Sequence, residues 1–296
     1  MSFSYASVIE TIAVNPRLRR ISLRVDDPET LAIQPAGDSA VGVYLPVVTW
    51  DGEPTAPPTV TGDDGTRYVD PASGSEGRNY SVRRHWPHPD GDRIDLDVIL
   101  HARGRGTTWA LTTAPGDRVG LDHARSWYRP EPTTEWQLLV ADLSGLPAMA
   151  RIIEELPGGV PVIAIVEVAD PDDLDYLPSH PDVTFVSTIG TGNGHAPSRL
   201  AQLTRDQRLP DGRGYCWFAG EAAESRTVRK HFRGNGWTVD QLDITGYWRF
   251  DSETWDAKFA RVADDVVAVW ERALADGKGE KVADEEFDEA LEQAGL

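Results

Sequence analysis

Cysteine and long apolar runs are nearly absent from this sequence of 296 residues. The one cysteine, Cys216, excludes an internal disulfide framework and a metal cluster held by thiolates. No stretch approaches the ~20 apolar residues of a membrane-spanning helix. The sequence does not open on a basic segment followed by an apolar run, so we expect no signal peptide. Together these absences predict a cytoplasmic protein.

Basic residues are also scarce, with 29 Lys or Arg against 48 Asp or Glu and a net charge of −19. This balance argues against nucleic acid and anionic membranes as partners, because both are bound through basic side chains. The charge is uneven: residues 251–296 hold 14 acids and 5 bases, whereas 78–88 hold three arginines, two histidines and no acid. A local basic patch on an acidic body favours an anionic small ligand. For the tail itself, a role in solubility explains the acids equally well.

The first part of the chain is typical of β-structure. Strand patterns occupy 4–14, 18–25, 41–49 and 92–100, and clusters of Gly, Pro, Asp and Ser separate them. Several short strands with such breaks predict an antiparallel barrel over residues 1–130.

The pattern changes near residue 130, where strands begin to alternate with helices. We expect buried strands at 136–141, 160–168, 183–187 and 215–219, and helices at 146–156 and 221–232. This alternation predicts a parallel sheet covered on both faces, over residues 131–250. Apolar residues from Trp255 to Leu274 then recur at three- and four-residue steps, which predicts an amphipathic helix that starts at Asp251 or Ser252, with a weaker helix after it, over 251–296. We expect this stripe to pack on the protein itself, and a dimer interface is the alternative.

The segment Arg78-Asn79-Tyr80-Ser81-Val82-Arg83 carries the most chemistry. On a strand, Arg78 and Tyr80 share one face, with the Ser81 hydroxyl beside them. A flavin dinucleotide needs this set: a guanidinium for the pyrophosphate, an aromatic plane for the isoalloxazine, and a hydrogen-bond partner for N5. An ordinary amphipathic strand with surface arginines is the alternative.

Three further segments suit a dinucleotide. Glycines before Thr107 and Thr108 open a probable helix, whose first N–H groups suit a pyrophosphate. Asp142 ends a buried strand and precedes a helix with Pro147 in its first turn. Ala219-Gly220-Glu221 ends the last core strand, at the edge where open parallel sheets bind ligands.

In this order, the segments resemble the siderophore-interacting proteins, a branch of the ferredoxin-reductase-like flavoproteins also called ferric-siderophore reductases. Besides the Arg-x-Tyr-Ser strand ending in Val-Arg, the matching residues are His101, Thr107-Thr108-Trp109-Ala110, Pro115-Gly116-Asp117, Asp142, Leu146-Pro147-Ala148, Ala219-Gly220-Glu221 and Gly246-Tyr247-Trp248-Arg249. The chain departs from the family at Ala102, where Gly is usual, and at Asp122-His123-Ala124-Arg125, where Gly-Pro-Arg-Gly is usual.

The resemblance implies an enzyme that binds FAD, takes hydride from NADH or NADPH and reduces a ferric siderophore, so that iron leaves as Fe(II). It implies catalytic roles for Tyr80, Ser81 and Glu221, and substrate binding by Arg83, Arg84 and His85. No metal site of the protein's own is expected. The implied cofactor-binding residues are Arg78, Tyr80, Ser81, Val82, Arg83, His101, Gly106, Thr107, Thr108, Trp109, Asp142, Leu146, Pro147, Ala219, Gly220, Glu221, Tyr247 and Trp248.

Some alternatives stay open at this point. The same fold could serve another acceptor, such as a quinone, a ferredoxin or free ferric iron, or a carrier that binds flavin or siderophore without catalysis. The nicotinamide-side segments argue against a carrier. Arg226 and Arg229 lie three residues apart and suit a 2′-phosphate, but a solvated helix face explains them equally well, so NADH and NADPH are both possible. We expect a monomer or a weak dimer.

Overall fold

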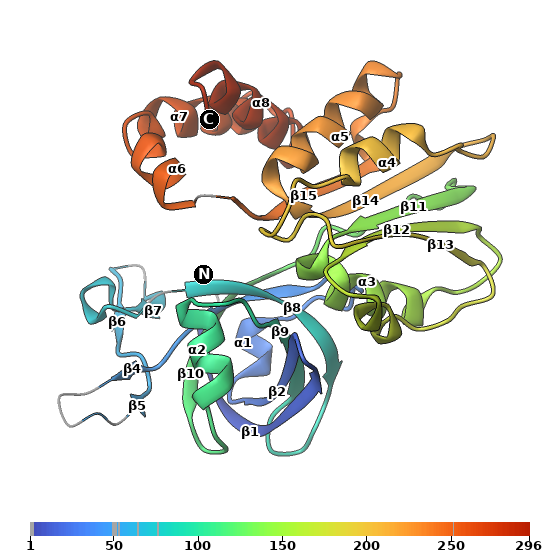
Figure 1. Cartoon of the computed structure of the whole chain (residues 1–296). Coiled ribbons are helices and arrows are strands. Elements are labelled where there is room, and N and C mark those ends of the chain that lie inside the picture. The colour runs from blue at the N-terminus through green and yellow to red at the C-terminus, as the bar shows by residue number, and fades with distance from the viewer. Residues whose placement is uncertain (1–2, 49–51, 53, 64, 76, 251) are drawn as a thin grey trace.

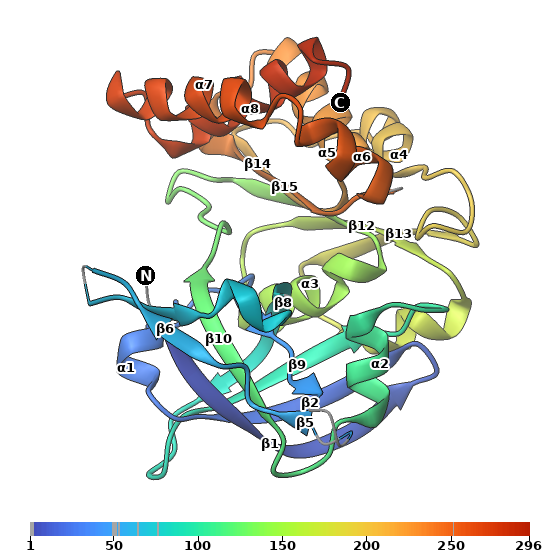
Figure 2. The same cartoon turned by 90° about the vertical axis from the view of Figure 1, so that its left-hand side faces the viewer.

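The structure is a computed structural model that describes residues 3–48, 52, 54–63, 65–75, 77–250 and 252–296. A barrel, a sheet with helices on both faces, and a C-terminal group of helices follow one another along the chain (Figures 1 and 2). Thr49 and Asp251, which the sequence places at the end of a strand and at a helix start, lie outside the described residues.

The N-terminal part is a closed antiparallel barrel with the strand order β1-β10-β3-β8-β9-β2. Alternate apolar side chains such as Leu23, Val41, Leu96 and Leu121 fill its interior and are fully buried. The predicted antiparallel barrel is therefore confirmed. The barrel strands are β1 (Phe3–Asn15), β2 (Leu18–Val25), β3 (Ala40–Tyr44), β8 (Gly77–Trp86), β9 (Arg93–Ile99) and β10 (Arg118–Arg125); two small sheets lie between β3 and β8 along the chain and contain β4 (Val47–Val48) with β5 (Pro54–Thr55) and β6 (Thr59–Thr61) with β7 (Arg67–Val69).

Strand β8 carries the Arg-x-Tyr-Ser segment and lies between β3 and β9. Tyr80 is opposite Val41 and Ser81 opposite Ala40 in the β3–β8 ladder. On the other side, the pairing with β9 shifts between Val82 and Arg84. Such an irregularity breaks the strict alternation of a strand, so that Ser81, Val82 and Arg83 are all buried.

The second part is a five-stranded parallel sheet in the order β13-β12-β11-β14-β15. The predicted parallel sheet is confirmed, but only four of its strands are predicted from the sequence, and β15 is not among them. Helix α3 packs on one face, toward the barrel, and α4 and α5 pack on the other (Figure 1). Because both faces are covered, β11 and β14 are almost continuously buried. The strands are β11 (Trp136–Ala141), β12 (Val162–Val168), β13 (Val183–Ile189), β14 (Gly214–Glu221) and β15 (Leu242–Trp248).

The C-terminal stripe forms two helices, where the sequence predicts one from Trp255 to Leu274. The chain bends at residues 260–262, so that Trp255 and Phe259 stack on each other while the next helix lies along α8. The α-helices are α1 (Pro28–Leu31), α2 (Arg105–Thr112), α3 (Leu146–Glu155), α4 (Leu200–Asp206), α5 (Ala222–Gly234), α6 (Ser252–Phe259), α7 (Ala263–Ala275) and α8 (Glu280–Gln293), and the 3₁₀ helices are η1 (Pro71–Ser73), η2 (Leu143–Gly145), η3 (Pro171–Tyr176) and η4 (Val239–Gln241).

In the part of the chain that the structure describes, no helix is long and apolar enough to cross a membrane.

Candidate functional site

Tyr80 and the start of α2 lie against each other at one side of the barrel. A Cβ atom on Gly106 would come within 2.5 Å of the Tyr80 hydroxyl, so only glycine allows this approach. The Tyr80 ring is 6.0 Å from that of Trp109, and burial raises the pKa of Tyr80 to about 12. Tyr80 is therefore a neutral aromatic group, held by α2.

The first turn of α2 differs in detail from the expected pyrophosphate site. The Thr108 N–H donates to the Gly104 carbonyl at 2.9 Å, as a helical amide does, so it is not available to a ligand. The Thr107 side chain accepts from the His101 N–H at 3.0 Å and ties that loop to the helix. The amides of Gly106 and Thr107 precede the first intrahelical bond and remain suited to an anion.

Ser81 and Tyr247 meet between the barrel and the sheet. Both hydroxyl oxygens are buried and face each other, yet among the described residues neither makes a well-formed hydrogen bond. Burial raises the pKa of Tyr247, so its hydroxyl is neutral. The Tyr247 ring is 6.3 Å from that of Trp127, in the segment that joins the two parts. An aromatic ring from the end of the sheet thus lies beside the residue expected near the flavin N5.

Arg78 and Val82, both on β8, differ strongly in their exposure to solvent. Arg78 is exposed at the end of β8, where its guanidinium donates to the Gly77 carbonyl at 2.9 Å. The Val82 side chain is fully buried in the barrel core. Any contact of Val82 with a cofactor would therefore be through its backbone, whose carbonyl accepts from Arg151 at 2.9 Å.

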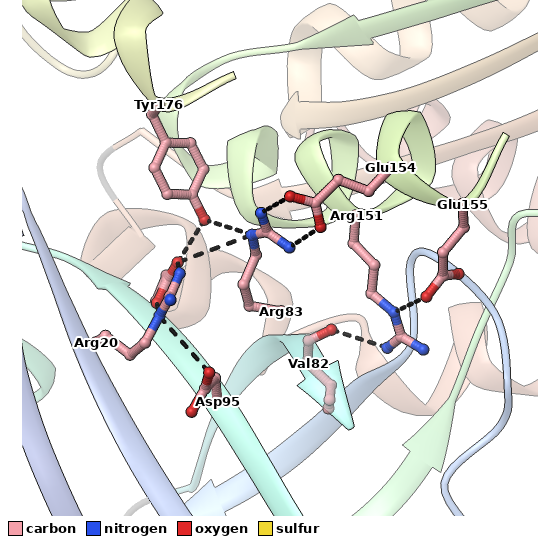
Figure 3. A network of polar contacts seen from close by, with 9 residues as sticks. Arg20, Val82, Arg83, Asp95, Arg151, Glu154, Glu155 and Tyr176 are labelled. Atoms are coloured by element: carbon pink, nitrogen blue, oxygen red, sulfur yellow. Dashed lines mark hydrogen bonds and ion pairs between the residues drawn. The ribbon is translucent and has the colours of Figure 1, made fainter. Parts of the chain in front are cut away.

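Arg83 is not part of an open cationic surface, and this burial contradicts the predicted role in binding substrate. Its residue exposure is 4%, and both terminal nitrogens donate to Glu154 of α3 at 2.6 Å (Figure 3). Its Nε donates to the Tyr176 hydroxyl at 3.1 Å. All three guanidinium nitrogens thus contact α3 or the Tyr176 hydroxyl, so Arg83 joins the barrel to the second part of the chain. A pattern of nearby arginines cannot reveal such a partner 71 residues away.

The neighbours of Arg83 remain nearer to solvent. Arg84 is exposed, whereas His85 contacts Asp92 at 2.7 Å between Nε2 and a carboxylate oxygen. Of the three residues expected to bind substrate, Arg84 alone keeps an open position.

At the carboxyl edge of the parallel sheet, Asp142 is the most buried ionisable group of the predicted site, with 1% exposure. It accepts from the Ser144 N–H at 2.8 Å and from the Trp248 indole N–H at 2.6 Å. Burial raises the pKa of Asp142 to about 6. Asp142 thus fixes Trp248 over the end of β11.

The other residues predicted at this edge are mostly structural. Leu146 and Ala219 are fully buried, and Pro147 is buried at the start of α3. A Cβ on Gly220 would lie 3.0 Å from Asp142, so the missing side chain makes room for that carboxylate. The buried side chains of Leu146, Pro147 and Ala219 therefore support the carboxyl edge of the sheet by packing.

Glu221 closes the edge by capping α5. Its carboxylate accepts from the Ala223 N–H at 2.6 Å and from the Phe250 N–H at 3.2 Å. This arrangement holds the segment after β15 against the start of α5. Glu221 also accepts from the Glu224 N–H at 3.3 Å, so its carboxylate is engaged in three structural hydrogen bonds.

A cavity of about 400 Å³ opens at this edge and includes residues that sequence reasoning missed. Glu167 ends β12, is completely buried, and accepts from Thr191, Ser198 and the Arg199 N–H at 2.7 Å each. Asn193 accepts from the Leu143 N–H at 3.0 Å and so joins the loop after β13 to the turn after β11. The Gly-Asn-Gly sequence around Asn193 is the one local signal of this loop.

His195, in the same loop, lies close enough to His101 of the barrel to influence it. Partial burial, with a smaller contribution from His195, lowers the pKa of His101. The two histidines therefore lie where the barrel loop and the sheet loop come near each other.

The residues present fit a flavin dinucleotide. Ser81 Oγ is a buried hydroxyl without a partner, and Trp109 Nε1 is a buried donor without one, among the residues described. A cavity of about 670 Å³ lies along α2 and is lined by Trp109, Arg105 and Thr108 among others. Buried polar atoms are normally satisfied, so these two mark places where a ligand would supply the missing bond. Within the described residues, no group of three or more His, Cys, Asp or Glu could hold a metal ion.

A closed antiparallel barrel joined to a parallel sheet is the fold of the ferredoxin-reductase-like class of proteins. Solved ferredoxin reductases share this fold at 16% and 17% identity, with TM-scores of 0.58 and 0.56. Within that class, residues 7–125 match the siderophore-interacting FAD-binding domain and residues 134–251 match the siderophore-interacting protein family. The chain belongs to the siderophore-interacting protein family.

Three relatives illustrate the range of this family. An uncharacterized protein of Mycobacterium tuberculosis is 33% identical over 53% of this chain, a match that spans 59% of the relative's length. The NADPH-dependent ferric-chelate reductase of Escherichia coli is 27% identical over 65% of this chain and 73% of its own. A siderophore utilization protein from T. fusca, of known structure, is 29% identical with a TM-score of 0.70, over 84% of this chain and 93% of that one.

Proposed function

We propose that this protein is an FAD-dependent NAD(P)H:ferric-siderophore reductase of the cytoplasm. The observation that carries the proposal is the meeting of Ser81 with Tyr247 between the barrel and the sheet, where the two buried hydroxyls face each other without a well-formed hydrogen bond and Tyr80 is the adjacent residue of β8. The family match and the ferric-chelate reductase relative support the same reading.

The chain's own residues would bind and orient the reactants. Tyr80, braced by Gly106 and Trp109, supplies a flat neutral surface for the isoalloxazine. The Ser81 hydroxyl is placed to donate or accept one hydrogen bond at the ring edge. Arg78 and the amides of Gly106 and Thr107 suit the pyrophosphate. Bound FAD would supply two-electron uptake from nicotinamide and one-electron delivery to iron, which no side chain here provides.

Tyr247 and Trp248 have complementary parts on the nicotinamide side. Tyr247 lies beside Ser81, where a nicotinamide must approach, so it has to move aside when the nucleotide enters. Trp248 is held by Asp142 and lines the cavity at the edge of the sheet. We therefore expect Tyr247 to move when the nucleotide binds and Trp248 to stay in place.

Ferric iron is the substrate in this proposal, and its release follows from coordination chemistry. Siderophores hold Fe(III) through hard oxygen ligands, which bind Fe(II) far less tightly. Exposed Arg84 is the residue of this chain best placed to attract an anionic siderophore.

An anaerobic absorbance titration with NADH and then NADPH, followed by a ferric siderophore and a ferrous-iron trap, tests the proposal. We expect flavin bands that bleach with nucleotide and return as trapped Fe(II) accumulates. A protein that binds flavin but is not bleached by either nucleotide would instead be a carrier. A colourless protein that gains no bands with added FAD would refute the flavin site at Tyr80.

A further inference from the structure

The cavity at the carboxyl edge of the parallel sheet has an unusual charge for a site that would receive a phosphorylated nucleotide. Four carboxylates line it, from Asp142, Glu167, Glu221 and Glu224, and among the described residues no Lys or Arg does. This cavity is where the proposed function places the pyridine nucleotide, because ligands of open parallel sheets bind at the carboxyl ends of the strands.

The segment that supplies Glu167 and the loop over this cavity brings no basic residue to it. Residues 167–198 contain no Lys or Arg, and of their acids Glu167 lines the cavity. The first basic residue after them, Arg199, has an exposed side chain and does not line the cavity. Of the two candidates on α5, Arg229 is bound instead to Asp288 of α8 and to the Ile244 carbonyl, and Arg226 does not line this cavity.

The carboxylates are held in place. Glu167 is completely buried and accepts three hydrogen bonds from its own loop, so it cannot turn toward solvent. Glu224 accepts from the Ala201 N–H at 2.8 Å and is half-buried in the first turn of α5. Fixed carboxylates repel a phosphate but can accept hydrogen bonds from ribose hydroxyls.

We propose that the electron donor is NADH and that the carboxylates at this edge exclude NADPH by repelling its 2′-phosphate. NADH and NADPH differ only in that group, which carries a negative charge of about 1.5 to 2 at neutral pH, as phosphate monoesters do. The inference rests on the proposed function, and it distinguishes this chain from the Escherichia coli relative whose name specifies NADPH.

The first test uses the unmodified full-length protein with two fragments, ADP-ribose and 2′-phospho-ADP-ribose, whose dissociation constants are measured by calorimetry. We expect the phosphorylated fragment to bind at least about tenfold more weakly, a difference of about 1.4 kcal/mol. Raising the salt concentration from about 0.01 M to 1 M shortens the screening length from roughly 30 Å to 3 Å. The difference should therefore shrink as salt rises. A basic site would show the opposite trend, with salt weakening the phosphorylated fragment selectively.

Two variants test whether the carboxylates of this cavity cause the discrimination against NADPH. Glu167→Gln keeps the shape and the oxygen acceptor, and Glu224→Arg reverses one charge at the cavity wall. Both should raise the ratio of NADPH to NADH in kcat/KM for flavin reduction, by about fivefold or more for the charge reversal. Glu131→Gln removes an exposed charge outside the cavity and should leave the ratio unchanged. A purely structural role of the two carboxylates would lower both rates and leave their ratio constant.

The outcomes separate this inference from the function on which it rests. If both fragments bind and the 2′-phosphorylated one binds as tightly or more tightly, the inference is wrong while the reductase proposal stands. If neither fragment binds and neither nucleotide bleaches the flavin, the nucleotide site and the inference fall together.

Discussion

Tyr80 and Gly106 are the pair of residues in which the flavin proposal can be tested most directly. Gly106→Ala adds a Cβ atom at the position 2.5 Å from the Tyr80 hydroxyl, so the ring must shift. We expect FAD affinity to fall by about tenfold, a cost of about 1.4 kcal/mol. The helix itself should gain up to about 1 kcal/mol of stability, because alanine favours a helix over glycine.

The double variant Tyr80→Phe, Gly106→Ala is the control for this prediction. Removing the hydroxyl removes the clash, so FAD affinity should recover toward that of Tyr80→Phe alone, as measured by flavin fluorescence titration. Additive losses in the double variant would show that the two side chains do not meet.

Asp142 is expected to make the stability of the protein depend on pH in an unusual direction. Its folded pKa of about 6 lies above its ordinary value of 3.8, so between these values the folded state keeps a proton that the unfolded chain has lost. The contribution is fully present below pH 3.8 and is lost as the pH rises through about 6.

In the Asp142→Asn variant, this loss of folding stability with rising pH should disappear. Urea unfolding between pH 4 and 7 should give a free energy that falls by roughly 2 kcal/mol less in the variant than in the wild type. The exposed Asp172→Asn is the control and should follow the wild type. Parallel curves for wild type and Asp142→Asn would contradict the raised pKa.

At the scale of elements, two arginines join strand β8 to helix α3, and each element supplies one of them to the other. Arg83 of β8 binds Glu154 of α3, and Arg151 of α3 binds the Val82 carbonyl of β8 (Figure 3). Helix α3 begins at the turn that follows Asp142, and β8 contains Tyr80 and Ser81. These contacts therefore hold the carboxyl edge of the parallel sheet, where we propose that the nucleotide binds, in position relative to the strand that carries Tyr80 and Ser81.

Arg83→Gln should slow flavin reduction by NADH by about tenfold, because hydride transfer is sensitive to misplacement by fractions of an ångström. The Michaelis constant for the siderophore should change little. Exposed Arg84→Gln is the matched variant, and it should do the opposite by raising that Michaelis constant without slowing flavin reduction. Anaerobic stopped-flow absorbance and steady-state assays separate the two steps, and equal effects of both variants on the siderophore constant would restore the substrate role to Arg83.

At the scale of the whole molecule, the C-terminal helices are joined to the sheet mainly through charge. Helices α7 and α8 bury Val266, Ala273, Ala283 and Leu291. Helix α8 then meets the basic face of α5 through ion pairs, and these are Arg229–Asp288, Lys230–Glu292 and Arg233–Glu285, with Lys281–Asp243 beside them. Three acids of the tail, Asp288, Glu292 and Glu285, thus have a structural use, which composition alone cannot reveal.

This docking should weaken with salt, because partly exposed ion pairs are screened. Between about 0.1 M and 1 M salt, amide hydrogen exchange in α8 should accelerate more than in α3. Asp288→Asn should accelerate α8 exchange already at low salt, whereas Glu289→Gln, at an exposed position without an ion pair in the described structure, should not. A salt-independent rate would mean that apolar packing holds the helix.

Local pattern was enough to predict much of this protein. Alternation with period two, turn residues and the change to strand–helix repeats predict the barrel and the parallel sheet, because each depends on neighbours a few residues apart. Local pattern also predicts that a helix begins near Thr107, whereas the cofactor roles of Tyr80 and Asp142 stay predictions. The division into 1–130, 131–250 and 251–296 stays a prediction of this kind.

Only the tertiary structure decided what these residues face. Arg83 is buried because Glu154, 71 residues later, comes beside it. Tyr247 meets Ser81, and Glu167 joins Asp142 at one cavity, because the barrel and the ends of separate strands are brought together. Such contacts depend on how distant segments pack. Local sequence therefore determined which groups are available, and packing determined which of them are free to bind a ligand.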